Sequence, residues 1–286
     1  MYSAQLVQSP ARTWPTPTIG AILRETLRRH WRDLLYWGGG GALMAYFVIA
    51  LAPNTDFLQA YEEITQMFPG FYEAFVGEDA AFAVTAEGYV TGEFFSWIVL
   101  VYAMYGVLAG LSVTINDEES GSLDVLLSMP VARWRVVLEK ALAFTLLMAG
   151  IVLVSVFGLW LGEASANVLE ADNVRLLEMA FNMLPSTLVT FAFTVFIGNL
   201  VRRRTLATWI GGVFIVASFV IDFLARLAPD SPILTPLAPL SFYRYYTPAQ
   251  VIQHGLNGSN VAVLMGAALM LLAAGVLLFQ RRDVGV

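Results

Sequence analysis

Long apolar runs alternate with short polar segments along most of the chain. Each run has about 20 residues, enough for a helix to cross the hydrocarbon core of a bilayer, which is roughly 30 Å thick. An even number of such helices would place both termini on one side of the membrane. The pattern predicts six membrane-spanning helices, at residues 34–52, 94–115, 141–161, 177–200, 206–223 and 261–279.

A further helix is predicted ahead of the first span, at residues 18–33. Its apolar residues recur at the i, i+3, i+4 spacing of one helix face, and most of its charged residues are arginines on the other face. We expect this amphipathic helix to lie along the inner leaflet and to turn sharply into the first span. His30 is expected to be an ordinary side chain at the membrane interface.

The segment 53–93 contains eight acidic residues and no lysine or arginine, which indicates that it faces outward. Its apolar residues recur at helical spacing, so we predict short amphipathic helices on the outer membrane surface. The acidic side chains form either a solvated outer face or a vestibule that enriches cations.

The segment 224–260 is apolar but contains five prolines, so it is too interrupted to be a seventh span. We predict a re-entrant outer hairpin of two short helices that packs against the spans or lines a cavity. Its apolar residues are expected to be buried: Ile233, Leu234, Leu237, Leu240, Phe242, Tyr245 and Tyr246.

Composition and charge agree with a membrane protein. Hydrophobic residues make up 58% of the chain and charged residues 13%, against roughly 25% charged residues in a soluble domain. The predicted fold class is therefore all-α and integral to the membrane, with one transmembrane domain over residues 1–286. Arginines gather at the N-terminus, after the second and fourth spans and at the C-terminus, which predicts that both termini are cytoplasmic. Cysteine is absent, which excludes disulfides and thiolate metal sites.

Small and polar residues inside the spans predict close helix packing. Gly106 and Gly110 form a small-xxx-small pair, and the glycines at residues 38–41 allow close approach on the first span. In the fourth span, hydroxyl groups around Pro185 can bond to backbone carbonyls that the proline leaves without a donor.

A charged loop with helical patterning, residues 117–140, separates the second and third spans. Its leucines share one face of a predicted helix over residues 117–130, whose serines can cap the helix and whose glutamates lie near its positive end. Pro130 ends this helix, and a second helical pattern begins near Arg133 and runs into the third span. The loop therefore joins a short helix to a spanning helix, an arrangement suited to transmitting force.

The loop resembles the cytoplasmic loop of type-2 ATP-binding-cassette (ABC) exporter permeases, through the pattern Glu119-x-Gly121-Ser122-Leu123-x-x-Leu126-Leu127-Ser128-x-Pro130-Val131-x-Arg133, closed by Lys140. The resemblance includes the amphipathic helix, the six spans and the outer hairpin. In that family the loop carries a coupling helix that docks on a separate ATPase. The resemblance assigns this role to Glu118, Glu119, Gly121, Ser122, Leu123, Leu126, Leu127, Pro130 and Arg133. The chain departs from the family at Asn116–Glu119, which lacks the usual basic residues, and at Glu139, where glycine is common.

The resemblance implies an exporter subunit in the plasma (inner) membrane of a prokaryote, moving a hydrophobic or amphipathic compound, a drug or a lipid, outward. The chain has no phosphate-binding loop, because its one lysine, Lys140, precedes alanine rather than serine or threonine. ATP and Mg²⁺ are therefore expected in a partner ATPase, and this chain is expected to be neither an enzyme nor a holder of metal or cofactor. A second permease copy, identical or similar, is expected to complete the membrane portion.

Candidate residues of the substrate path lie on the second and fifth spans, which flank the central path in the permeases that the chain resembles. They are Trp97, Val101, Tyr105, Trp209 and Phe219. The alternative is that this aromatic stripe serves packing or lipid contact. Asp222, late in the fifth span, is either functional or hydrated near the outer interface.

Three alternatives remain open from the sequence. The charged loop could be a capped cytoplasmic linker with solvated charges. An ion-coupled secondary transporter would need buried carboxylates, for which the spans offer Asp222 and the boundary residue Glu178. An intramembrane hydrolase would need a nucleophile and a base at membrane depth, whereas His30 and His254 are predicted outside the spans.

Overall fold

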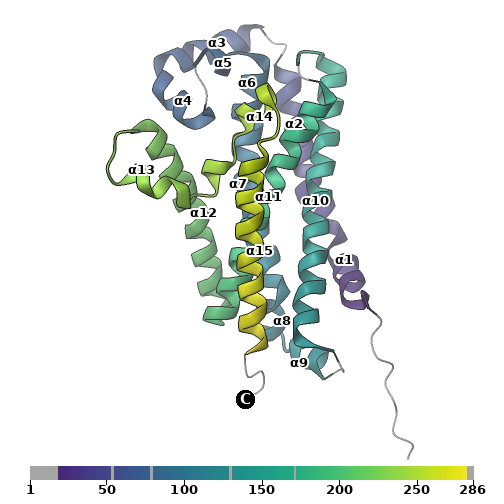
Figure 1. Cartoon of the computed structure of the whole chain (residues 1–286). Helices are drawn as coiled ribbons and strands as arrows, with labels where there is room; N and C mark the ends of the chain where they lie inside the picture. Colours follow the sequence, from purple (N-terminus) through teal and green to yellow (C-terminus); the bar gives the residue numbers. More distant parts are fainter. Residues whose placement is uncertain (1–18, 53–54, 78–79, 129–130, 171, 282–286) are drawn as a thin grey trace, which may run out of the picture.

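The computed structural model describes residues 19–52, 55–77, 80–128, 131–170 and 172–281. Within these ranges all regular structure is helical. Six helices are long and apolar enough to cross a membrane, and each overlaps a predicted span. They run over Ala21–Leu51, Ala86–Val113, Arg133–Ala166, Asn173–Val201, Arg204–Leu227 and Gly258–Gln280. The spanning helices lie side by side as a bundle (Figure 1).

The first spanning helix is built from three consecutive elements: α1 (Ala21–Asp33), a π-helical turn, η1 (Leu34–Gly38), and α2 (Gly39–Leu51). The chain stays helical throughout, so the sharp turn predicted between the amphipathic helix and the span is not found. A π-helical turn inserts one extra residue per turn and lets a helix change its packing face without breaking. The start of the predicted amphipathic helix, residue 18, lies outside the described residues.

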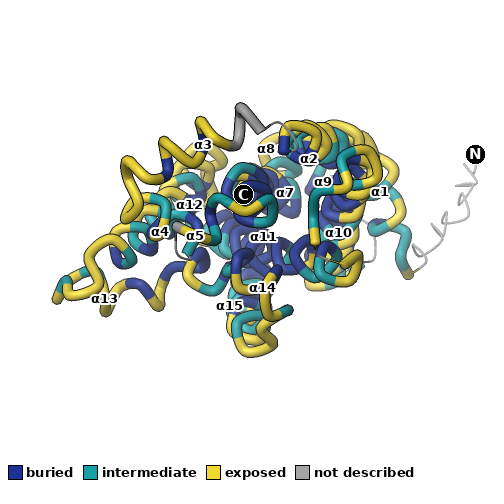
Figure 2. The backbone as a smooth tube through the Cα atoms, turned by 90° about the horizontal axis from the view of Figure 1, so that it is seen from above, coloured by how far each residue is buried: buried dark blue, intermediate teal, exposed yellow. Residues whose placement is uncertain are grey.

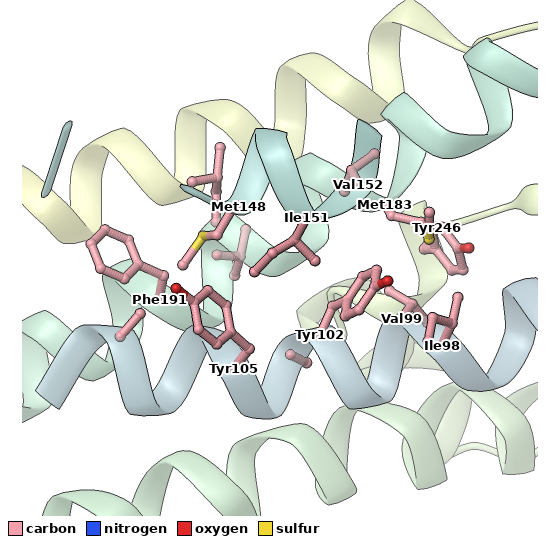
Figure 3. Packing of buried hydrophobic residues seen from close by; sticks show 14 of the residues in the cluster. Ile98, Val99, Tyr102, Tyr105, Met148, Ile151, Val152, Met183, Phe191 and Tyr246 are labelled. Atoms are coloured by element: carbon pink, nitrogen blue, oxygen red, sulfur yellow. The ribbon is translucent and has the colours of Figure 1, made fainter. Parts of the chain in front are cut away.

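The second spanning helix is similar, with α6 (Ala86–Val90), a π-helical turn, η2 (Thr91–Phe95), and α7 (Ser96–Val113). The remaining spanning helices are α10 (Arg133–Ala166), α11 (Asn173–Val201), α12 (Arg204–Leu227) and α15 (Gly258–Gln280). Buried residues concentrate on α7 and α11 at the centre, whereas α12 and α15 lie at the margin (Figure 2). Figure 3 shows Tyr102 and Tyr105 of α7 extending toward Met148 and Ile151 of α10.

The close approaches predicted through glycine are confirmed at Gly106 and Gly110 and, on the first span, at Gly38 and Gly41. An added methyl group at residue 39 or 40 would meet no atom within 4 Å, so the prediction is wrong there. Gly106 and Gly110 of α7 lie directly against the α11 backbone and its threonines. Gly158 of α10 lies against the backbone of Ala42 in α2, and these two helices share one of the largest contacts in the bundle.

In α11, Thr187 donates to the carbonyl of Met183 at 3.0 Å. The carbonyl that Pro185 leaves without a backbone donor is that of Phe181, four residues earlier, so the role predicted for the hydroxyl groups stays a prediction.

The two long segments between spans lie at one end of the bundle, at the top in Figure 1. The first forms α3 (Thr55–Met67), α4 (Pro69–Val76) and α5 (Ala80–Ala83) before it enters α6. The second forms α13 (Leu234–Leu237), two 3₁₀ turns, η3 (Ala238–Leu240) and η4 (Tyr243–Tyr245), and α14 (Pro248–His254). The helices predicted for the first segment are confirmed, but the predicted pair in the second is four short elements because prolines interrupt it repeatedly.

The outer segment 224–260 is anchored by tyrosines rather than by all of its apolar residues. Tyr243 and Tyr246 donate to the carbonyls of Ser96 and Phe95, at 2.8 and 3.0 Å. Burial raises the pKa of both phenols, so they stay protonated and able to donate. The predicted burial is right for Phe242 and Tyr246. It is wrong for Ile233, Leu237 and Leu240, which are exposed because α13 and η3 project from the bundle and contact mainly α12.

The contact at Gly158 yields a stability prediction. A methyl group at this position would overlap the backbone of Ala42, so Gly158→Ala must push α2 away from α10. Overpacking of this kind costs about 1–3 kcal/mol. We expect a lower melting temperature in detergent, measured by size-exclusion chromatography after heating. Gly266→Ala on α15 is the control, because its methyl group would meet no atom within 4 Å; equal melting temperatures for the two variants would contradict this packing.

Candidate functional site

The charged loop between the second and third spanning helices folds as two short helices, α8 (Ile115–Glu119) and α9 (Ser122–Leu127). The single helix predicted over residues 117–130 is therefore wrong. Gly121 lies between them with a φ of +70°, in the left-handed region that favours glycine. Ser120 donates to the carbonyl of Asp117 at 3.2 Å and stabilises this turn.

Leu123 and Leu126 lie toward the bundle, and the acidic end of the loop is exposed. Leu123 is 1% exposed and belongs to the hydrophobic core, and Leu126 is half-buried. Glu118, Glu119 and Gly121 are at the exposed tip or beside it. Glu119 also accepts a hydrogen bond from the backbone of Arg204 at the start of α12, at 3.2 Å. Among the described residues of the loop, the carboxylates of Glu118 and Glu119 are therefore accessible to a partner.

The other predicted coupling residues lie around this tip. Ser122 begins α9, and its hydroxyl is 3.0 Å from that of Ser120. Arg133 begins α10. Pro130 and the side chain of Leu127 lie outside the described residues, so the predicted helix end at Pro130 stays a prediction, while α9 itself ends at Leu127.

Lys140 fixes the loop to two spanning helices. Its side chain is buried on α10, where the ammonium forms an ion pair with the carboxylate of Asp117 in α8. The same ammonium donates to the carbonyl of Ser112 in α7 at 3.3 Å. A buried charge needs such partners, because an unpaired one would be costly to desolvate. Lys140 therefore joins α10, α8 and the end of α7.

Glu139, the neighbouring residue, holds the start of α1. Its carboxylate accepts the backbone N–H groups of Gly20, Ile22 and Leu23, at 3.2, 3.0 and 3.2 Å. Arg135 of the preceding turn lies 2.6 Å away and orients the carboxylate. The first N–H groups of a helix have no partner within the helix and attract negative charge. Sequence reasoning missed this role, although the departure of Glu139 from the family pattern marked the position.

A cavity of about 670 Å³ lies between α1, α8, α9 and α10. Its charged lining residues are mutually paired: Glu25 with Arg29 at 2.8 Å, and Asp117 with Lys140. Apolar side chains, Ile22 and Leu126 among them, complete the wall. A size of roughly 300–1,000 Å³ is typical of small-molecule sites.

A second cavity of about 190 Å³ extends from the first along α7 and shares His30 and Ser112 with it. His30 is therefore not an ordinary interface side chain, as predicted, but a partly buried one at the junction. Its Nδ1 is 3.1 Å from Oδ2 of Asp33, and its ring meets Phe144 edge-on at 4.9 Å. Tyr105 donates to the same Oδ2 at 3.0 Å. Trp37 lies beside Tyr105, with ring centroids 5.4 Å apart.

The predicted path residues do not form one site. Trp97 contacts Phe75 of α4 at a centroid distance of 5.0 Å, and Phe219 lies 6.3 Å from the same ring. Tyr105 is buried near the other end, beside Asp33. Trp209 is 70% exposed on α12, and Val101 is half-buried on α7. Only Trp97 and Phe219 are brought close, through a ring that the sequence did not single out.

Asp222 is 1% exposed, so its predicted hydration is wrong. Its carboxylate pairs with Arg226 at 2.8 Å and faces Arg244 of η4 at 4.0 Å. These arginines stabilise the charge inside the protein. Glu178 is also paired, with Arg175 at 2.8 Å. Both carboxylates available to an ion-coupled transporter are therefore engaged by arginine.

The chain matches the family model described as ABC-2 family transporter protein over residues 21–284. It belongs to this family. The chain is thus an ABC-2 membrane permease subunit without an ATPase domain, and ABC-2 permeases work with ATP-binding-cassette subunits. This assignment decides against the secondary transporter and the intramembrane hydrolase. A comparison with curated proteins gives no match.

In this ABC-2 permease, Glu139→Gln should loosen the start of α1. Hydrogen bonds to a charged group contribute about 1.5–3 kcal/mol, and the neutral amide also turns a donor toward the helix N–H groups. We expect the amides of residues 20, 22 and 23 to exchange with deuterium at least about tenfold faster, measured by hydrogen-exchange mass spectrometry. Glu63→Gln, at an exposed position on α3, is the control and should leave the exchange of these amides unchanged. Unchanged exchange in Glu139→Gln would show that the cap does not hold α1.

Proposed function

We propose that this permease exports a hydrophobic or amphipathic compound, with its N- and C-terminal ends and the α8–α9 tip in the cytoplasm. The arginine-rich segments gather at the α9 end of the bundle: α1, the start of α10 and residues 202–204. The acidic segment 55–77 lies at the other end. Membrane proteins insert with their arginine- and lysine-rich loops on the cytoplasmic side, which supports a cytoplasmic α9 end. The opposite end then faces outward and releases the substrate.

We propose that the α8–α9 tip is where the partner ATPase docks. The observation that carries this is the attachment of the tip: Lys140 joins it to α7 and α10, and Glu119 joins it to α12. A docked ATPase that shifts the tip would therefore displace several spanning helices together. A solvated linker would not need a buried ion pair at its base.

The exposed acidic tip gives a specific test of docking. Glu119→Arg reverses a charge on the proposed surface, whereas Glu63→Arg makes the same change on α3 at the other end. The tagged permease is purified from its native membrane, and an ABC ATPase, recognised by its phosphate-binding sequence, is quantified by mass spectrometry. We expect Glu119→Arg to reduce recovery at least about tenfold and Glu63→Arg to leave it unchanged. Equal recovery from both variants would place the ATPase elsewhere.

We also propose that a second permease copy, identical or similar, packs against α12. An apolar stripe on this helix is exposed, and its members are three or four residues apart, as in helix–helix seams. Its members are Leu206, Trp209, Val213, Val216, Val220, Leu224 and Leu227. A pairing here would place Trp209 at the seam between the copies.

The chain contains no cysteine, so single introduced cysteines report this seam directly. Val213→Cys is expected to form a disulfide-linked dimer in oxidised membranes, seen as a doubled mass on a non-reducing gel. Met270→Cys on α15 is equally exposed to the membrane and should stay monomeric. A homodimer through α12 would be contradicted by linkage at residue 270 in place of residue 213. Linkage at neither residue would favour a similar, non-identical partner.

A further inference from the structure

We infer that the two joined cavities beside α1 bind an organic cation with an apolar body, and that this cation is the class of substrate the permease takes up. That the cation is a substrate rests on the proposed export function, whereas the binding site is argued from the structure alone. The site lies between α1, α7 and α10, on a different face of the bundle from the α12 stripe.

The charge balance of the cavities points to a cation. In the larger cavity, Glu25 is paired with Arg29 and Asp117 with Lys140, so each charge already has an opposite partner. In the smaller cavity, Asp33 has no arginine or lysine within ion-pair distance among the described residues. Tyr105 donates to Asp33 from a neutral hydroxyl, and His30 is an ionic partner only when its ring is protonated. A carboxylate in a cavity without a permanently charged cationic partner favours a cationic ligand.

The atoms of Asp33 leave room for this ligand. Both hydrogen bonds fall on Oδ2, and no donor among the described residues reaches Oδ1. The side chain is 25% exposed and lines the cavity, so it is accessible without any rearrangement of the core. A cationic group can therefore approach the free oxygen while the other stays bonded and fixed in place.

The aromatic wall favours a cation with bulky, weakly hydrated groups. Trp37, Tyr105 and Phe144 line the smaller cavity around Asp33. The faces of such rings attract cations, and quaternary ammonium groups are bound in proteins by aromatic side chains of this kind. The wider cavity next to it, with apolar residues such as Ile22 and Leu126, accommodates the apolar body. A phosphate group would find Arg29 and Lys140 already paired, which favours a simple cation over a zwitterionic lipid headgroup.

The experiment compares benzyltrimethylammonium with phenylmethanesulfonate, two soluble molecules of similar shape and opposite charge. Binding of each to the purified full chain in lipid nanodiscs is measured by saturation-transfer NMR. We expect the cation to bind and the sulfonate not to bind. Asp33→Asn, which keeps the shape of the side chain, should weaken binding of the cation at least about tenfold. Glu63→Gln, at the other end of the bundle, is the control and should bind the cation as the unchanged protein does.

Equal binding of the cation to Asp33→Asn and the unchanged protein, or equal binding of the two probes, would overturn the inference. Should Asp33→Asn fail to fold, as judged by size-exclusion chromatography, Trp37→Leu decides instead. Because this variant lacks the indole ring, it should bind the cation several-fold more weakly, and its interaction with the sulfonate should not change. Unchanged affinity for the cation would overturn the inference. Co-purification of an ABC ATPase with the unchanged permease is measured in parallel. If no ATPase co-purifies and the permease still binds the cation, the export function is contradicted but the binding site is not.

Discussion

The position of α1 depends on one carboxylate, that of Glu139. It accepts three backbone N–H groups at the start of α1, from a residue more than a hundred positions later in the chain, and Arg135 keeps it oriented. Helix starts need acceptors, and a charged acceptor that is shielded from solvent is among the strongest available. Because α1 forms one wall of both cavities, the shape of the candidate binding site follows from this contact. The same contact also ties α1 to the helix that leaves the charged loop.

Glu139 and Lys140 are adjacent, and together they connect α10 with α1, α7 and α8. A movement of the α8–α9 tip therefore reaches α1 through two consecutive residues on one rigid helix. This gives a physical route by which an ATPase docked at the tip could change the cavity beside Asp33. At the other end, Arg244 of the outer segment faces the buried carboxylate of Asp222 in α12, and the phenols of Tyr243 and Tyr246 donate to the carbonyls of Ser96 and Phe95. These contacts hold the outer segment to α12 and to the start of α7. The bundle is thus held at both ends by polar contacts and in its middle by glycine and aromatic packing.

Hydropathy was sufficient to predict the six long helices, the all-α fold and the closely packed glycines, because these depend on local composition and on small side chains. The loop motif led to the correct family. The shape of the loop was not predictable, because a glycine with positive φ divides it and Leu123 is buried in the bundle. Contacts between distant residues were missed, because the sequence around Glu139 and Asp33 does not indicate that the fold brings the start of α1 to Glu139 and Tyr105 to Asp33. The candidate path residues do not form one site. Residues on one face of a long helix lie at different depths, and each contacts a different neighbouring element, which the sequence pattern does not indicate.

The central claim is that α1 and α10 move as one body when the ATPase acts. The chain has no cysteine, so spin labels can be placed at residues 28 on α1, 142 on α10 and 277 on α15, all exposed positions. Distances between labels are measured by double electron–electron resonance in the complex with its ATPase, with and without trapped ATP. We expect the distance between residues 28 and 142 to stay constant while the distance between residues 28 and 277 changes, because Lys140 and Glu119 attach the α8–α9 tip to α7, α10 and α12 and not to α15. A change between residues 28 and 142 on ATP binding would contradict the claim.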